Sequence, residues 1–197
     1  VLINCPDYPF SVSADNQNGA CQAAEHLVEL GHRRLAYVAN PHSCGTDLDR
    51  FTGYQMVLSE QGIPFDEGLV VKGDGTLRGG VQAIGQLMAL TPQPTAILCF
   101  NDMMAMGAIH ALSRQNKRVP RDCSVIGFDD LEQAAYYCPP LTTVRQPSYR
   151  LGQAAMSMML QLIESGVAPQ GDLLPTELVV RETTGPAPAT VSGREGR

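Results

Sequence analysis

The feature that most constrains the fold is the regular alternation of short apolar segments with longer segments of helical periodicity. Apolar runs lie at residues 1–4, 34–40, 69–73, 95–100 and 124–130. Between them, apolar residues recur three or four positions apart, and each periodic segment ends near a glycine or a proline. Strands that alternate with amphipathic helices predict an α/β fold with a parallel, doubly wound sheet.

Capping and stop signals set the limits of the expected helices. The first helix begins at an Asp15-Asn16 cap and ends at Gly31. The others are expected over residues 47–62, from about 81 to near Pro92 and Pro94, over 103–115 and over 148–164, and a last strand over 177–182.

The stretch CPPLTTVRQP, residues 138–147, interrupts this rhythm. Two adjacent prolines, Pro139 and Pro140, fit neither a helix interior nor a central strand, because each lacks an N–H donor and has a fixed φ. The β-branched run at residues 142–144 favours an extended backbone. We therefore predict a stiff, extended segment between two parts of the fold.

The charge balance limits the function classes. With 14 Lys and Arg against 20 Asp and Glu, the net charge of −6 argues against a nucleic-acid-binding surface on the chain itself. No apolar run reaches the ~18 residues of a membrane-spanning helix. The start, VLINCPDYPF, has neither a basic leader nor a signal-peptide core, and it lacks Met, so we expect a fragment of a cytoplasmic protein.

Motifs for catalysis or for metal binding are missing from the sequence. The six cysteines are scattered without a CxxC pair, which indicates reduced thiols, and the four histidines form no HExxH pattern. The glycine-rich stretch GDGTLRGG, residues 73–80, fits neither a dinucleotide fingerprint nor a P-loop and indicates a turn. We therefore expect no enzyme activity, no catalytic residue, no metal and no cofactor.

Polar residues follow several of the expected strands directly. Asn4, Asn101 and Asp129 stand at such positions, and Arg50 stands on the first turn of the next helix. Because a ligand crevice lies beyond the carboxyl ends of parallel strands, these groups suit a hydrogen-bonding pocket for a small molecule. Spacing alone leaves alternatives open: Arg50 as a surface arginine, and Asn101 and Asp129 as helix caps.

Five motifs in a fixed order give this chain a family resemblance. ADNQNGACQAAEHLVELGHRRLAYV comes first, followed by Arg50 with FTGY, then ILCFNDMMAMGA, VIGFDD and PPLTTVRQ. Over residues 1–184 the sequence resembles the lactose-repressor (LacI/GalR) family of bacterial transcription regulators. The resemblance implies a type I periplasmic-binding-protein-like fold, in which two lobes joined by three crossovers close on a small effector. PPLTTVRQP matches one crossover.

The resemblance also implies a site and a division of the chain. The effector-contacting positions of the family correspond to Arg50, Asn101, Asp129, Gln146 and, less closely, Asn4. The expected division puts a partial N-terminal lobe at 1–14 and 142–169, a complete C-terminal lobe at 15–141 and 170–184, and a disordered tail at 185–197. The partial lobe would expose the helix face that carries Met158, Met159 and Leu162.

The function implied by the resemblance is the effector-sensing and dimerising region of a LacI-type regulator. Its partners would be a small metabolite (a sugar, a sugar derivative or a purine), a second copy of the chain, and operator DNA through an N-terminal head that is absent from this sequence. The alternative is a periplasmic-type sugar-binding protein of a transport system.

Two departures from the family leave the effector class open. Sugar-binding members often have an aromatic residue where Gly75 stands and another where Ser148 stands, and such rings pack against sugar or purine rings. Tyr8, Phe10 or Phe100 could take their place.

Overall fold

A six-stranded sheet forms the larger part of the molecule. The computed structural model describes residues 1–5, 8–167, 171 and 173–189. The sheet order is β4-β3-β5-β6-β7-β9, and all neighbours are parallel except β7 and β9. The strands are β3 (Leu35–Ala39), β4 (Val70–Lys72), β5 (Ala96–Cys99), β6 (Ser124–Asp129), β7 (Thr142–Arg145) and β9 (Glu177–Val179). The predicted α/β class with a doubly wound sheet is confirmed.

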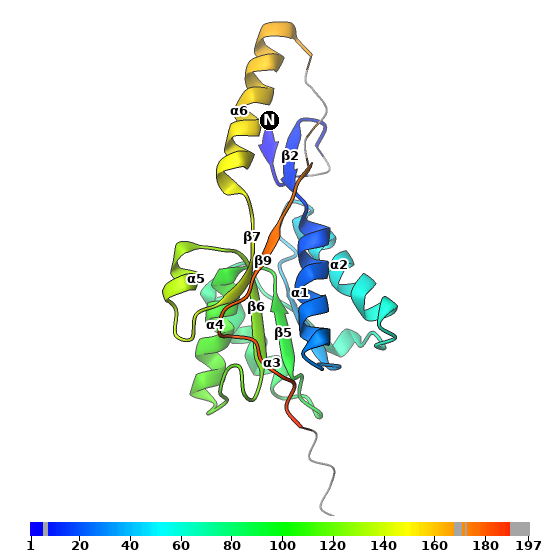
Figure 1. The fold of residues 1–197 in the computed structure, drawn as a ribbon, viewed down its shortest axis with the longest axis vertical. Helices are drawn as coiled ribbons and strands as arrows, with labels where there is room; N and C mark the ends of the chain where they lie inside the picture. Colours follow the sequence, from blue (N-terminus) through cyan, green and yellow to red (C-terminus); the bar gives the residue numbers. More distant parts are fainter. Residues whose placement is uncertain (6–7, 168–170, 172, 190–197) are drawn as a thin grey trace, which may run out of the picture.

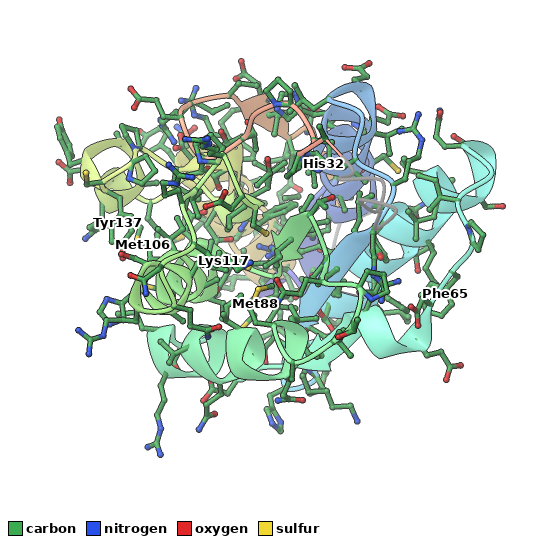
Figure 2. All side chains as sticks on the ribbon, turned by 90° about the horizontal axis from the view of Figure 1, so that it is seen from below. His32, Phe65, Met88, Met106, Lys117 and Tyr137 are labelled. Carbon is green, nitrogen blue, oxygen red and sulfur yellow. The ribbon has the colours of Figure 1, made fainter. Side chains whose placement is uncertain are left out.

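Helices cover both faces of this sheet because side chains alternate along the strands. Leu35 and Tyr37 of β3 pack with one helix pair, whereas Ala36 and Val38 pack with the other. The first pair is α1 (Asn16–Glu29) and α2 (Thr46–Glu60), and the second is α3 (Leu77–Leu87) and α4 (Asp102–Arg114). Figure 2, seen from below, shows helices on both sides of the strands.

A second, smaller sheet stands above the larger one in Figure 1. Its order is β1-β2-β8, all parallel, with β1 (Leu2–Ile3), β2 (Ser11–Ala14) and β8 (Leu173–Leu174). Helix α6 (Ser148–Ser165) rises beside it (Figure 1), and a small cluster that includes Val12 and Leu151 joins the two. Of this smaller unit, β1, β2 and α6 fall within the residues that the sequence analysis assigned to a partial N-terminal lobe.

The strand pairing differs from the expected division of the chain at two points. Strand β7 pairs with β6, so residues 142–145 belong to the larger sheet and the chain crosses over only after Arg145. Strand β8 pairs with β2, so residues 173–174 belong to the smaller sheet. Residues 142–145 stay in the larger unit because the side chains of Thr142, Thr143 and Val144 are all buried there.

Two further expectations also need correction. Met158 is buried against the smaller sheet, whereas Met159 is exposed. In the tail, the N–H of Gly185 donates to Ser124 Oγ (3.1 Å) and the N–H of Ala187 donates to the Leu30 carbonyl (2.9 Å). Residues 185–187 are therefore packed on the larger unit, and residues 190–197 of the expected disordered tail lie outside the described residues.

Some short elements were not expected from the sequence. Strand β2 and the short helix α5 (Glu132–Tyr136) are two of these unexpected elements. The strand expected at 69–73 is preceded by a 3-10 turn, η1 (Glu67–Leu69), so it begins only at Val70. None of the described helices is both long and apolar enough to cross a membrane.

Helices α3 and α4 approach each other at glycines. A Cβ atom on Gly107 would lie 2.0 Å from the Leu77 carbonyl oxygen, and one on Gly80 would lie 2.1 Å from the Met104 carbonyl oxygen. Gly85, also on α3, faces open space, since no atom lies within 4 Å of the corresponding point. The close packing of this helix pair therefore depends on two specific glycines.

We expect Gly107→Ala to lower the free energy of unfolding by about 1–3 kcal/mol, because the added methyl group would force the two helix backbones apart. Gly85→Ala is the matched control, and it should raise that free energy by about 0.5–1 kcal/mol because alanine restricts the unfolded chain. Urea denaturation of both variants measures the difference. Equal effects of the two substitutions would contradict the packing described here.

Candidate functional site

Arg50 lies buried at the carboxyl ends of the central strands. The whole residue is only 3% exposed. Its guanidinium carbon lies 4.4 Å from the ring centre of Phe100 and 3.6 Å from that of Phe128. Phe100 directly follows β5, and Phe128 is part of β6. The planar cation is therefore in contact with two aromatic rings, an arrangement that stabilises a desolvated guanidinium.

Polar contacts hold the same guanidinium from three directions. Its Nε donates to Asn16 Oδ1 (2.9 Å), its Nη1 donates to the Phe100 carbonyl oxygen, and its Nη2 lies 3.6 Å from Asp129 Oδ1. Burial lowers the pKa of Arg50, while the carboxylate of Asp129 acts in the opposite direction. The alternative of a surface arginine is therefore wrong.

Asp129 ends β6 with a backbone φ of 122°, in the region that side chains rarely adopt. Its Oδ1 accepts a hydrogen bond from Gln146 Nε2 (2.5 Å). Burial raises the pKa of this carboxyl, although Arg50 and the Gln146 amide both favour the charged form. The N-cap of the next helix, α5, is Leu131, so the helix-cap alternative for Asp129 is also wrong.

Gln146 and Asn4 extend this chain of contacts into the smaller unit. Asn4 Nδ2 donates to Gln146 Oε1 (2.7 Å), and Asn4 itself has a φ of 55° at the end of β1. The structure thus connects four of the five predicted residues in the order Arg50, Asp129, Gln146 and Asn4.

Asn101 is placed differently from the other four. Its Oδ1 accepts from the N–H of Met104 (2.9 Å), which caps α4, and its Nδ2 donates to the Gly75 carbonyl (2.9 Å). Both ends of its amide are therefore engaged in holding the loop before α3 against the start of α4. The helix-cap alternative for Asn101 is what the structure shows.

Two residues of the site were missed by the sequence analysis. Asn16 is 1% exposed and receives the Nε–H of Arg50, while the helix cap is provided by Asp15. Its position two residues after the end of β2 was the available signal, but β2 itself was not predicted. Asp102, at the start of α4, is fully buried: its Oδ2 accepts from the Leu131 N–H (2.8 Å) and its Oδ1 from the Thr143 hydroxyl.

The neighbouring carboxyl, Asp130, has a different environment from that of Asp129. Arg181 Nη2 lies 2.6 Å from its Oδ1, and Arg145 Nε lies 2.7 Å from its Oδ2. Although burial favours the neutral acid, these two arginines lower the pKa of Asp130. Among residues 1–5, 8–167, 171 and 173–189, no three His, Cys, Asp or Glu side chains are grouped to hold a metal ion.

Comparison with known proteins gives the family of this fold. Residues 24–184 match the family described as periplasmic binding protein-like domain. The chain is 37% identical over 175 residues to the HTH-type transcriptional repressor CytR of Escherichia coli K12, covering 88% of this chain and 51% of that repressor. It therefore spans about half the length of this curated relative.

Two solved structures have the same fold. A LacI family transcriptional regulator from Mycobacterium smegmatis superposes with a TM-score of 0.87 at 32% identity, covering 94% of this chain and 70% of that one. The complex of the transcriptional regulator CelR with cellobiose superposes with a TM-score of 0.84 at 35% identity, covering 88% of this chain and 53% of that one.

The fold and the polar strand ends define the class, which is a type I periplasmic-binding-protein-like domain. Within that class, the chain belongs to the LacI/GalR family and corresponds to its effector-binding domain.

The buried carboxyl of Asp102 gives a testable dependence on pH. Burial raises its pKa from 3.8 to about 7, so the folded state binds this proton more tightly than the unfolded state does. The contribution of Asp102 to the free energy of unfolding is therefore largest at low pH. It falls by up to about 1.4 kcal/mol per pH unit as pH rises from about 4 to about 7, and it is constant above that.

We expect Asp102→Asn to remove this slope, because the amide has the same shape without the titration. Urea denaturation at several pH values between 4 and 7 measures the difference between variant and parent. Asp130→Asn is the control, because the pKa of Asp130 is lowered from 3.8 and its titration falls below this window. An unchanged slope in Asp102→Asn would contradict the assignment.

Proposed function

We propose that this chain is the effector-sensing and dimerising region of a LacI-type transcriptional regulator that works in the cytoplasm. The observation that carries the proposal is the pair of buried Arg50 and partly exposed Asp129, which Gln146 and Asn4 connect to the smaller unit. An effector that binds one arrangement of the two units better than the other shifts the population between them. A difference of about 1–3 kcal/mol in affinity is enough for a regulatory response.

The chemistry of the pair favours a neutral, hydroxylated effector. Arg50 and Asp129 contribute one positive and one negative charge, so together they add no net charge to the site. Within the described residues, Gln146 and Arg50 both contact Oδ1 of Asp129, and Oδ2 has no protein hydrogen bond. With the Asp129 side chain 26% exposed, Oδ2 is suited to accept a ligand hydroxyl while Arg50 Nη2 donates to a ligand oxygen.

A sugar, a sugar derivative or a nucleoside-like purine fits these requirements. The CelR relative binds cellobiose, as its name states, which supports a carbohydrate as the first class to test. A regulator is favoured over a transport component because the curated relative is an HTH-type repressor. By the same comparison, DNA binding in the full-length protein would come from a helix-turn-helix head, and enzyme activity is not proposed.

The strand pairing suggests a revised division of the chain. We assign residues 15–145 and 175–184 to the larger, C-terminal lobe and residues 1–14 and 146–174 to the smaller, partial lobe. Three crossovers then lie at 14–16 (β2 to α1), 145–148 (β7 to α6) and 174–177 (β8 to β9), each between an element of one unit and an element of the other. Short crossovers of this kind allow hinge closure with little change inside each lobe.

We expect a panel of cellobiose, ribose, galactose, gluconate, adenosine and hypoxanthine to contain at least one ligand that raises Tm. At a concentration of 100 times Kd, the stabilisation of about 2.7 kcal/mol corresponds to about 5–10 °C for a domain of this size. Differential scanning fluorimetry measures the shift.

In Arg50→Lys and Asp129→Asn the same ligand should give a much smaller shift relative to each variant without ligand. Lysine lacks the planar fork, and the amide of asparagine has only one acceptor oxygen. Asp122→Asn, at an aspartate that lies away from this site and pairs with Arg118, is the control and should keep the full shift. A ligand whose shift survives both site substitutions would place the binding site elsewhere.

Dimerisation is proposed because operator half-sites are related by a two-fold axis that a regulator dimer matches. We expect sedimentation velocity at micromolar concentration to give a species of twice the chain mass. A monomer at all concentrations up to about 100 μM would show that this region does not dimerise alone, because stable interfaces have tighter constants.

A further inference from the structure

Ala14, the last residue of β2, is held by side-chain amides on both sides. Its N–H donates to Asn4 Oδ1 (2.9 Å), and its carbonyl oxygen accepts from Asn16 Nδ2 (3.0 Å). Ala14 is only 1% exposed; its hydrogen bond with Asn16 is buried and the one with Asn4 is partly buried. Each amide thus uses one of its ends to fix the backbone of the same residue.

The other end of each amide leads to the candidate site. Asn16 Oδ1 accepts from Arg50 Nε (2.9 Å), and Asn4 Nδ2 donates to the amide of Gln146 (2.7 Å), which in turn donates to Asp129. Since Arg50 and Asp129 are themselves paired, the contacts close on themselves. We call this set the six-residue ring; it consists of Asn4, Ala14, Asn16, Arg50, Asp129 and Gln146.

The ring joins the two sheets of the molecule. Asn4 and Ala14 belong to the smaller unit, and Arg50 and Asp129 lie at the strand ends of the larger unit. Asn16 and Gln146 stand on two of the crossovers between them, which run through the narrow middle of the molecule in Figure 1. The ring therefore spans the two units at the point where the chain passes between them.

One contact of the ring is looser than the rest. Arg50 Nη2 and Asp129 Oδ1 are 3.6 Å apart, whereas the five hydrogen bonds of the ring measure 2.5 to 3.0 Å. Asp129 is also the ring member with a φ of 122° and a partly exposed carboxylate. A ligand that bridges the two side chains would act at this contact, and the five tighter bonds would carry the displacement to Ala14.

We propose that the six-residue ring is the connection through which occupancy of the Arg50–Asp129 pair changes the position of β1 and β2. Gln146 is a positioning residue in it, since it joins Asp129 to Asn4 by one donor and one acceptor of a single amide. The link to an effector rests on the proposed function, but the coupling within the ring exists without any ligand and is tested without one.

The test measures hydrogen exchange of the Ala14 N–H by NMR in the ligand-free chain. Gln146→Glu places a second carboxylate beside Asp129 and removes the donor, so the ring opens at this residue. We expect exchange at Ala14 to rise about five- to tenfold, the effect of losing one hydrogen bond of ordinary strength. The Leu98 N–H, in the core of the larger sheet, reports global unfolding and should not change.

Asp129→Ala provides the decisive comparison, because Asp129 does not touch Ala14. As a single substitution, Asp129→Ala should raise the exchange rate of the Ala14 N–H. In the Gln146→Glu background it should cause no further increase in that rate, because the connection is already broken there. Gln153→Glu makes the same chemical change on the exposed face of α6 and should leave Ala14 unchanged. If Asp129→Ala destabilises the whole fold, Asp129→Asn is used, with Leu98 as the reference.

The proposal is overturned if Asp129→Ala leaves Ala14 exchange within twofold of the parent, or if the two substitutions act additively. Either result would mean that the hydrogen bonds of Ala14 are held by their local neighbours only. Neither result bears on effector binding, which the thermal-shift panel tests separately, so the two proposals fail independently.

Discussion

The arrangement of the strand ends depends on one buried positive charge. Taking a guanidinium out of water costs on the order of several kcal/mol, and only a complete set of partners offsets that cost. Arg50 obtains its partners from separate elements: Asn16 at the start of α1, the carbonyl of Phe100 after β5, and Asp129 at the end of β6. Its charge is satisfied only when all three elements are in their native positions, so this side chain fixes the geometry of the site.

A parallel sheet is what allows residues so far apart in sequence to meet. Successive strands of one direction bring their carboxyl ends to one edge, which is how residues 50 and 129 come together. Asn4 and Gln146 arrive from the smaller sheet and from a crossover at the same edge. Because an ion pair with a buried member is rarely more stabilising than a hydrophobic pair of the same size, the contribution of this pair is mainly to fix the positions of the groups around it.

The sequence was informative wherever a pattern depends on local burial. Both faces of the larger sheet are covered, so β3, β4, β5 and β6 are mainly apolar runs and were recognised. Strand β2, with the sequence SVSA, alternates small polar and apolar residues and was not. The polar positions at and just beyond strand ends indicated Arg50, Asp129 and Asn4, whereas Gln146 was indicated only by the family resemblance. The pairing of Asn16 with Arg50, and of Asp102 with Thr143, could not be predicted, because partners are decided by tertiary distances that spacing does not contain.

Two adjacent aspartates at the end of β6 differ in how completely their charges are paired. Asp130 is engaged on both oxygens by Arg145 and Arg181, which lowers its pKa despite burial and joins the end of β6 to two neighbouring segments. Asp129, one residue earlier, has a single cation at 3.6 Å and a raised pKa, so its carboxylate is under-compensated. A fully paired carboxylate gains little from a ligand, whereas an under-compensated one gains each hydrogen bond that a ligand donates. Asp130 therefore fixes the backbone at the end of β6, and under the proposed function Asp129 is the carboxylate there that a ligand would engage.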